Sequence, residues 1–184
     1  CFKEYLVDVH EELHSKPDVR VLLEGAQGFG LDIDHGDYPY VTSSHCTSAA
    51  ALLAGIPPQA IDKVWGVAKI YETYVGAKKF EPDDETFKII RNIGKEYGAT
   101  TGRPRQCNWL NWDFLEKSIK VNGVTDLVFN KMDVLRQIDK WTLIHKDKKV
   151  TFDTEGEMKK WIVQKANLLP YNPNVYFSGD PNGL

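Results

Sequence analysis

The sequence predicts an α/β fold with a mainly parallel central sheet flanked by helices. Short apolar, β-branched runs alternate along the chain with longer segments in which apolar residues recur at helical spacing. The first of these runs, residues 19–24, breaks abruptly into a turn that contains Gly25, Gly28 and Gly30. A polar loop follows, and open parallel sheets bind ligands beyond the carboxyl ends of their strands. We therefore expect a binding loop here, with an ordinary long surface loop as the alternative.

The remaining elements follow from periodicity and from residues that end helices or turns. Helices are expected where apolar residues recur every three or four positions, bounded by glycine, proline or first-turn acids. Strands are expected at short β-branched or apolar runs. In chain order the predicted elements are helix 2–14, strand 19–24, helix 47–55, strand 63–75, helix 82–97, helix 112–121, strand 125–129, a hairpin of 142–145 with 150–152, helix 155–168 and strand 175–177.

Composition narrows the class of protein. The 184 residues are 42% apolar, which is enough for one sizeable core. The formal net charge of −3, with both signs interspersed, predicts neither a nucleic-acid partner nor a membrane surface. Three cysteines without metal-type spacing fit a reducing compartment. Helical spacing begins at the first residues and no second domain boundary is visible, so we expect 1–184 to be part of one longer α/β domain.

The loop after the first strand carries a long pattern that resembles adenylosuccinate synthetase. The pattern consists of Glu24-Gly25-Ala26-Gln27-Gly28, Asp32-Ile33-Asp34 and Tyr38-Pro39-Tyr40-Val41-Thr42-Ser43-Ser44. The resemblance implies a P-loop-NTPase-like fold and a purine biosynthesis ligase that joins L-aspartate to the 6-position of IMP, with GTP hydrolysis, to give adenylosuccinate. It also implies Mg²⁺ and GTP as cofactors, a homodimer and a cytoplasmic location.

A second stretch, residues 98–105, combines hydroxyls, a glycine turn and two guanidinium groups. Arginine offers a planar fork of donors that matches a carboxylate or phosphate, and amides around Gly102 can add an anion nest. From the residues alone, a solvated arginine pair in a polar loop is an equal alternative. The resemblance implies that Thr100 and Thr101 contact the aspartate carboxylates and that Arg105 pairs with them. It places Arg103 between aspartate and the ribose of the acceptor nucleotide.

A third stretch, Asn130-Lys131-Met132-Asp133, directly follows the predicted strand 125–129. An Asp carboxylate in this position can accept from guanine N1–H and from the 2-amino group, while the Lys stem covers the ring. A chance tetrapeptide is the alternative reading. The family usually has Thr in place of Asn130, but Lys131 and Asp133 match its donor-nucleotide site. Ser178 and Gly179 resemble its other base-contacting loop, although the order of Ser178-Gly179-Asp180-Pro181 differs from the usual one.

The resemblance also assigns residues to the acceptor nucleotide. It places Gln27 on the purine and Thr42 near the 5′-phosphate, with Val75 and Gly76 beside the ribose through their backbone atoms. A glutamine can both donate to and accept from a purine 6-oxo edge. Without the resemblance, Gln27 is an ordinary loop amide.

The resemblance covers only the C-terminal part of the family. The glycine-rich phosphate loop, with its catalytic Asp, and the catalytic His are absent from the sequence. We therefore expect no catalytic residue and no metal ligand in this segment, and no activity from the segment alone. His35 and His45 flank the binding loop, but a catalytic role is not expected because no partner carboxylate can be assigned.

Departures from the family pattern leave two further functions open. Residues 45–50, Tyr74 and residues 78–81 differ from the pattern around the acceptor nucleotide. A phage-type branch, active in the host cytoplasm, converts dGMP and aspartate to 2-amino-deoxyadenylosuccinate with ATP, dATP or GTP. A regulatory GTP-binding module is suggested by residues 130–133 alone. The arginine loop discriminates against such a module, because a GTPase switch needs no dicarboxylate clamp.

Overall fold

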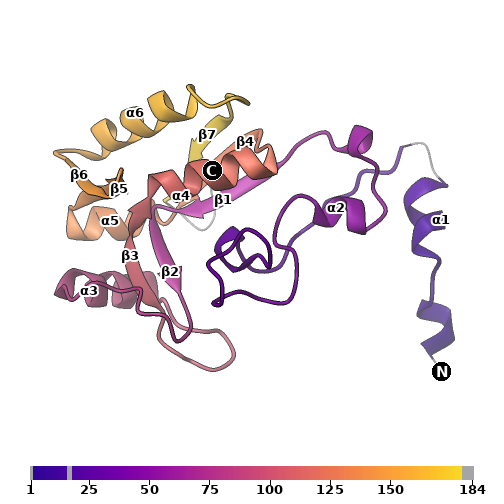
Figure 1. The fold of residues 1–184 in the computed structure, drawn as a ribbon, viewed down its shortest axis with the longest axis horizontal. Helices are drawn as coiled ribbons and strands as arrows, with labels where there is room; N and C mark the ends of the chain where they lie inside the picture. The colour runs from indigo at the N-terminus through magenta and orange to yellow at the C-terminus, as the bar shows by residue number, and fades with distance from the viewer. Residues whose placement is uncertain (1, 16–17, 180–184) are drawn as a thin grey trace. The chain divides into compact units, whose positions relative to one another are not determined.

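The computed structural model describes residues 2–15 and 18–179 (Figure 1). These residues fall into two compact units, Cys1–Asp62 and Lys63–Leu184, and each unit is described by itself. Within the described ranges, no helix is both long and apolar enough to cross a membrane. The expectation that 1–184 forms part of a single domain stays a prediction.

The first unit consists mainly of loops with short helical turns. Asp8 caps α1, because its carboxylate accepts hydrogen bonds from the backbone N–H groups of His10 and Glu11. The predicted helix 2–14 is therefore two short helices, and the predicted helix 47–55 is reduced to four residues. The elements are 3-10 helices Phe2–Tyr5, Phe29–Leu31 and Pro58–Ala60, with α1 Val9–His14 and α2 Ala50–Leu53.

The predicted buried strand at residues 19–24 is wrong. These residues are irregular and exposed, and Leu22 is 89% exposed. A strand is stable only when a neighbour pairs with its backbone N–H and C=O groups, and the described part of the first unit contains no strand. The apolar run therefore does not mark a core element of this unit.

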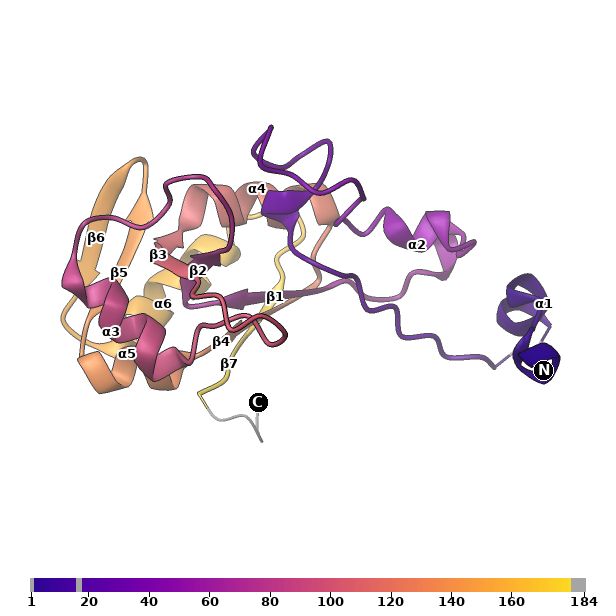
Figure 2. The ribbon, with the colours of Figure 1, turned by 90° about the horizontal axis from the view of Figure 1, so that it is seen from below.

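A three-stranded parallel sheet forms the centre of the second unit. Its order is β1-β4-β7, and both neighbouring pairs are parallel (Figures 1 and 2). The middle strand is buried from Asp126 to Phe129, as expected for a strand covered on both faces. The strands are β1 Trp65–Lys69, β4 Asp126–Asn130 and β7 Asn174–Phe177.

A second sheet of four strands has the order β2-β3-β5-β6. Pairs β2/β3 and β5/β6 are antiparallel, and β3/β5 is parallel. The predicted hairpin is confirmed, whereas the predicted strand 63–75 is wrong as one strand. It divides at the fully buried Ile70 into β1 and β2, which belong to different sheets. The strands are β2 Tyr71–Tyr74, β3 Gln106–Asn111, β5 Trp141–His145 and β6 Lys148–Phe152.

Four helices flank the sheets of the second unit. Side chains of Asp84, Asn111 and Thr154 accept from backbone N–H groups and cap the first turns of three of them. Helix α3 ends at Lys95, whose φ of 53° stops the helix, and α3 packs beside α5 (Figure 2). The helices are α3 Glu85–Gly94, α4 Trp112–Asn122, α5 Met132–Ile138 and α6 Glu155–Ala166.

The core confirms the predicted α/β class with helices around a parallel sheet. Trp109 and Trp112 are buried, with 4% and 0% exposure, so both pack in the core rather than stack on a ligand base. The Trp112 ring meets Trp161 of α6 edge-on, with the ring centroids 5.4 Å apart. This packing fixes the frame from which the polar loops project.

Candidate functional site

The predicted donor-nucleotide residues gather where β4 and β7 end. Parallel strands end at one edge of a sheet, and Lys131 follows β4 while Ser178 and Gly179 follow β7. The Met132 N–H donates to the Ser178 carbonyl at 3.2 Å, and the Ser178 N–H donates to the Phe129 carbonyl at 2.8 Å. The two loops are therefore tied together by their backbones. Asp180 and Pro181 lie outside the described residues.

Lys131 lies in a left-handed backbone conformation, with φ 65°, at the start of α5. Its ammonium group donates to the Gly94 carbonyl at 3.0 Å, so the end of α3 supports it. Asp133 lies half-buried in the first turn of α5, and its carboxylate accepts no hydrogen bond from the described residues. The Asn130 Oδ1 atom is buried and has no hydrogen-bond partner among the described residues. Acceptor groups without a partner thus mark this loop.

Gly179 is required by close packing. A Cβ at this position would collide with the Arg136 guanidinium and lie 3.3 Å from the Asp133 backbone nitrogen. The loop after β7 therefore approaches the start of α5 more closely than a side chain would permit.

The predicted aspartate loop is a closed turn with an exposed tip. The Arg105 N–H donates to the Glu96 carbonyl at 2.9 Å, and the Gly98 N–H donates to the Arg103 carbonyl at 2.8 Å. Gly102 has a positive φ of 63°, which the turn requires. Thr100, Thr101 and Arg103 are exposed on this turn, whereas Arg105 is half-buried at its base.

Glu96 is a buried carboxylate on which three side chains converge. Its Oε2 accepts from Lys69 Nζ at 2.7 Å and from Arg105 Nη1 at 2.9 Å, and its Oε1 accepts from the Tyr71 hydroxyl at 2.7 Å. Glu96 is 1% exposed. Burial opposes its charge, but the bonds from Lys69 and Tyr71 outweigh burial and hold the pKa of Glu96 below its ordinary value. Burial lowers the pKa of Lys69 despite the bond to Glu96.

Sequence reasoning missed Glu96 and Lys69. The one signal in the sequence was an acid two residues before the glycine that opens the arginine loop. The structure brings the aspartate loop and the donor-nucleotide loop to the same end of α3, because Gly94 holds Lys131 and Glu96 holds Arg105.

The predicted acceptor-nucleotide residues lie in both units. In the first unit, Gln27 is exposed with a φ of 67°, and Ser44 Oγ donates to its side-chain oxygen at 3.4 Å. Thr42 is half-buried, and its N–H donates to the Leu31 carbonyl at 2.8 Å.

In the second unit, Val75 and Gly76 follow β2. Both are exposed, and the Gly76 carbonyl accepts from Gln106 Nε2 at 3.3 Å.

The described residues do not fit a magnesium site. Asp32, Asp34 and His45 approach within 4.8 Å, but the buried Asp32 already accepts from the N–H groups of Asp34, His35 and Cys46 at 2.9, 3.0 and 2.6 Å. Burial opposes the charge of Asp32, and these bonds hold its pKa below the ordinary value. Mg²⁺ requires several oxygen ligands in octahedral order, whereas Asp32 folds its own loop. No step through magnesium is derived from these residues.

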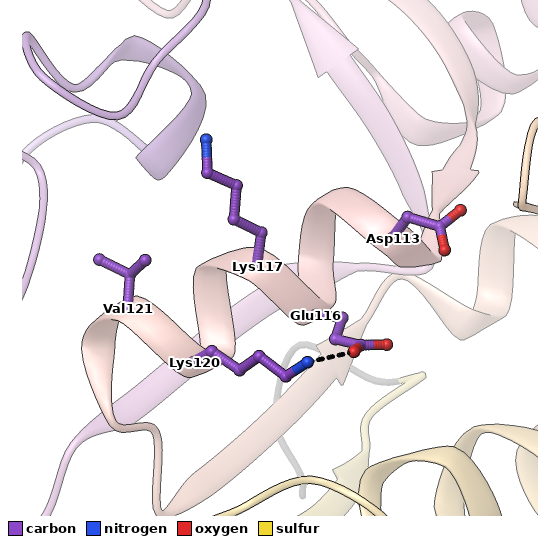
Figure 3. A pocket seen from close by; sticks show the side chains of 5 residues that line it. All are labelled: Asp113, Glu116, Lys117, Lys120 and Val121. Atoms are coloured by element: carbon purple, nitrogen blue, oxygen red, sulfur yellow. Dashed lines mark hydrogen bonds and ion pairs between the residues drawn. The ribbon is translucent and has the colours of Figure 1, made fainter.

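A shallow pocket lies on α4 and is lined by charged side chains of that helix (Figure 3). Lys120 and Glu116 form an ion pair of 2.5 Å across one turn. None of the lining residues coincides with a predicted site residue. Exposed pairs of this kind are ordinary features of a solvated helix face. The lining residues are Asp113, Glu116, Lys117, Lys120 and Val121.

Comparison with known proteins decides the family. A family model described as adenylosuccinate synthetase matches residues 1–172. The chain belongs to the adenylosuccinate synthetase family. The curated adenylosuccinate synthetase of Xylella fastidiosa strain 9a5c is 51% identical over 148 residues, which are 76% of this chain and 34% of that protein. The adenylosuccinate synthetase of Nitratidesulfovibrio vulgaris strain DP4 is 40% identical over 177 residues, which are 94% of this chain and 40% of that protein.

Solved structures of adenylosuccinate synthetases agree with this family. The fully ligated enzyme of Plasmodium falciparum has a TM-score of 0.85 and 28% identity, over 98% of this chain and 53% of that one. A succinoaminodeoxyadenylate synthetase of cyanophage S-2L, bound to dGMP and dATP, has a TM-score of 0.57 and 19% identity, over 85% of this chain and 43% of that one. The second likeness concerns the fold alone. The chain thus spans 34–40% of the two curated relatives above.

Proposed function

We propose that the protein to which this chain belongs is a ligase that joins L-aspartate to the 6-position of IMP. GTP phosphorylates the purine 6-oxygen, which becomes a leaving group, and the aspartate amine displaces the phosphate. The observation that carries this proposal is the meeting of Arg105 and Lys131 at one end of α3. A dicarboxylate clamp beside a guanine-reading loop is what this reaction requires.

Each predicted binding residue has a proposed role. Thr100, Thr101 and Arg105 bind the aspartate carboxylates, because hydroxyl and guanidinium donors match carboxylate oxygens. Lys131 and Asp133 bind guanine, together with the backbone of Ser178 and Gly179. For the acceptor nucleotide we propose Gln27 at the purine, Thr42 at the phosphate, Val75 and Gly76 at the ribose, and Arg103 between ribose and aspartate.

The rest of the assembly follows from the family. We propose that the intact protein is a cytoplasmic homodimer and that Mg²⁺ acts with GTP. The described residues supply neither a catalytic base nor a magnesium site, so the isolated segment is expected to be inactive.

Release of GDP tests the reaction class. The intact protein is incubated with IMP, GTP and Mg²⁺, with and without aspartate, and GDP is measured. We expect GDP release only when aspartate is present, because the purine phosphate is displaced only by the amine. GDP release that ignores aspartate would support a regulatory GTP-binding module instead and would sink the ligase proposal.

The phage-type acceptor is the second candidate. Tyr74 stands where the family has Arg, and the departures at residues 45–50 and 78–81 also surround the acceptor-nucleotide residues. The same assay with dGMP in place of IMP separates the two acceptors. A higher kcat/KM with dGMP than with IMP would make the phage-type reaction the function.

Replacing Arg105 by Leu tests the aspartate clamp. We expect the KM for aspartate to rise about 30-fold, which corresponds to about 2 kcal/mol for a lost charged hydrogen bond. The KM values for GTP and IMP should change less than about twofold, a change worth under roughly 0.5 kcal/mol. An aspartate KM equal to that of the unmodified protein would show that Arg105 does not touch this substrate.

A further inference from the structure

Arg105 is held at its backbone and at its side chain before any substrate is present. Its N–H donates to the Glu96 carbonyl at 2.9 Å, and its carbonyl accepts from Arg91 Nε at 2.6 Å. Arg91 is in turn paired with Glu81. The Arg105 guanidinium donates through Nη1 to Glu96 Oε2 at 2.9 Å. Glu96 therefore fixes both ends of the residue, whereas the tip of the same loop stays exposed.

The bond to Glu96 leaves much of the guanidinium for a second anion. A guanidinium has five N–H donors, and the bond to Glu96 uses Nη1. The Arg105 side chain is 34% exposed, while that of Glu96 is 2% exposed. The arginine thus has its rear edge anchored on a buried carboxylate and part of its surface toward solvent.

The charges around Glu96 leave an excess of positive charge. One carboxylate faces two cations, Lys69 and Arg105, and a neutral donor, Tyr71. Each Glu96 oxygen is occupied, because Oε2 takes both cations and Oε1 takes the hydroxyl. A buried carboxylate with this set of donors orients them and leaves the cluster attractive to a further anion.

We propose that Glu96 is a positioning residue, which orients the Arg105 guanidinium to receive a carboxylate of the incoming dicarboxylate substrate, with Lys69 and Tyr71 fixing Glu96 in turn. This inference rests on the ligase proposed above. A preoriented donor loses less conformational freedom when the substrate binds, so its effect is on substrate affinity.

Glu96→Gln tests the inference in the intact protein. The amide keeps the size of the side chain but has one acceptor in place of two, so it cannot satisfy Lys69, Arg105 and Tyr71 together. We expect the aspartate KM to rise about tenfold or more, which is the scale of losing one charged hydrogen bond. At saturating aspartate, kcat should fall less than about threefold. The GTP KM should change less than about twofold, because Lys131 is held by the Gly94 backbone carbonyl and not by Glu96.

Glu155→Gln is the matched control. Glu155 also binds one arginine and one lysine, with Arg136 Nε at 2.6 Å and Lys159 Nζ at 2.6 Å. This variant loses a similar cluster in the same unit, but it should leave the aspartate KM within about twofold of the unmodified protein. An aspartate KM for Glu96→Gln no higher than that for Glu155→Gln would overturn the positioning role.

A readout without catalysis separates this inference from the ligase proposal. In protein labelled with ¹⁵N-arginine, the Nη signals of Arg105 are assigned by their loss in Arg105→Lys. We expect slow rotation of this guanidinium in the unmodified protein and faster rotation in Glu96→Gln. If the unmodified protein shows no aspartate-dependent GDP release, the ligase proposal fails while this signal still reports the anchor. Equal rotation in both proteins would refute the anchoring itself.

Tyr71→Phe keeps the test decisive if Glu96→Gln does not fold. Tyr71 is 1% exposed, and Phe preserves its packing while removing the hydroxyl that fixes Glu96 Oε1. We expect the aspartate KM to rise about threefold, since one neutral hydrogen bond is lost. A rise that is equal for aspartate and GTP would indicate general loss of structure and would contradict the inference.

Discussion

Asp133→Asn is expected to reverse the preference of the intact protein between GTP and xanthosine triphosphate. In the unmodified protein the Asp133 carboxylate accepts from guanine N1–H and from the 2-amino group. Asparagine keeps the shape but turns one acceptor into a donor, which opposes the 2-amino group and matches the 2-oxo group of xanthine. The half-buried position at the start of α5, beside the Gly179 turn, makes an unmatched polar contact costly.

The size of this change is the sum of a loss and a gain. Each unmatched or restored polar contact is worth on the order of 2 kcal/mol, so the ratio of the two kcat/KM values should move by roughly two to three powers of ten. Kinetics with GTP, xanthosine triphosphate and ATP under identical conditions measure it. Asp147→Asn is the control, because it makes the same change at an exposed hairpin position where φ is 57°. That variant should keep the preference for GTP.

The outcome also decides the identity of the donor base. If the unmodified protein binds ATP as tightly as GTP, Asp133 does not read guanine, and the phage-type alternative gains support. An unchanged preference in Asp133→Asn would place the carboxylate away from the base edge.

Periodicity predicted the elements whose burial is repeated along the segment. Helices α4 and α6, strands β4 and β7 and the β5–β6 hairpin match their predicted ranges within a few residues. In each, apolar residues recur at the spacing of one element, so local sequence and tertiary packing agree.

The missed elements are those in which the local signal is weak. Strand β3 carries Gln106, Asn108 and Asn111, and its buried residues alternate with amides rather than with charged residues. Helix α5 has seven residues and starts at a left-handed lysine without a capping side chain, so no start signal precedes it. The run at residues 19–24 gave the opposite error, because a strand also needs a partner.

The candidate site could be predicted as loops but not as a cluster. Motifs that follow strands indicated the arginine loop and the guanine-reading loop, and the family confirms the class to which these motifs belong. Glu96 carried no such signal, because its role depends on Lys69 and Tyr71, which lie 27 and 25 positions away in the sequence. Long-range pairing of this kind is set by the fold and is not written in any short window.

Glu72→Gln is expected to stabilise the chain at alkaline pH and to have little effect at acid pH. Burial in β2 raises the pKa of Glu72 to about 7, against the opposing effects of the Asn111 N–H and the Lys78 charge. The folded state therefore holds a proton that the unfolded state releases near the ordinary value of 4.5. Stability from this group is present below pH 4.5, falls as the pH rises from 4.5 to about 7, and is lost above that range.

The glutamine removes this pH dependence because it stays neutral, and its oxygen can still accept from the Asn111 N–H, which lies 3.1 Å from Glu72 Oε1. A shift from 4.5 to about 7 corresponds to up to about 3 kcal/mol. Urea unfolding of both proteins at pH 4.5 and pH 8 measures the difference. Glu155→Gln is the control of opposite sign, since the bond from Arg136 lowers the pKa of Glu155 to about 2 and its loss should destabilise the protein at pH 8. If Glu72→Gln and the unmodified protein differ by the same free energy at both pH values, Glu72 is charged in the folded state at pH 8 without cost, and the prediction is wrong.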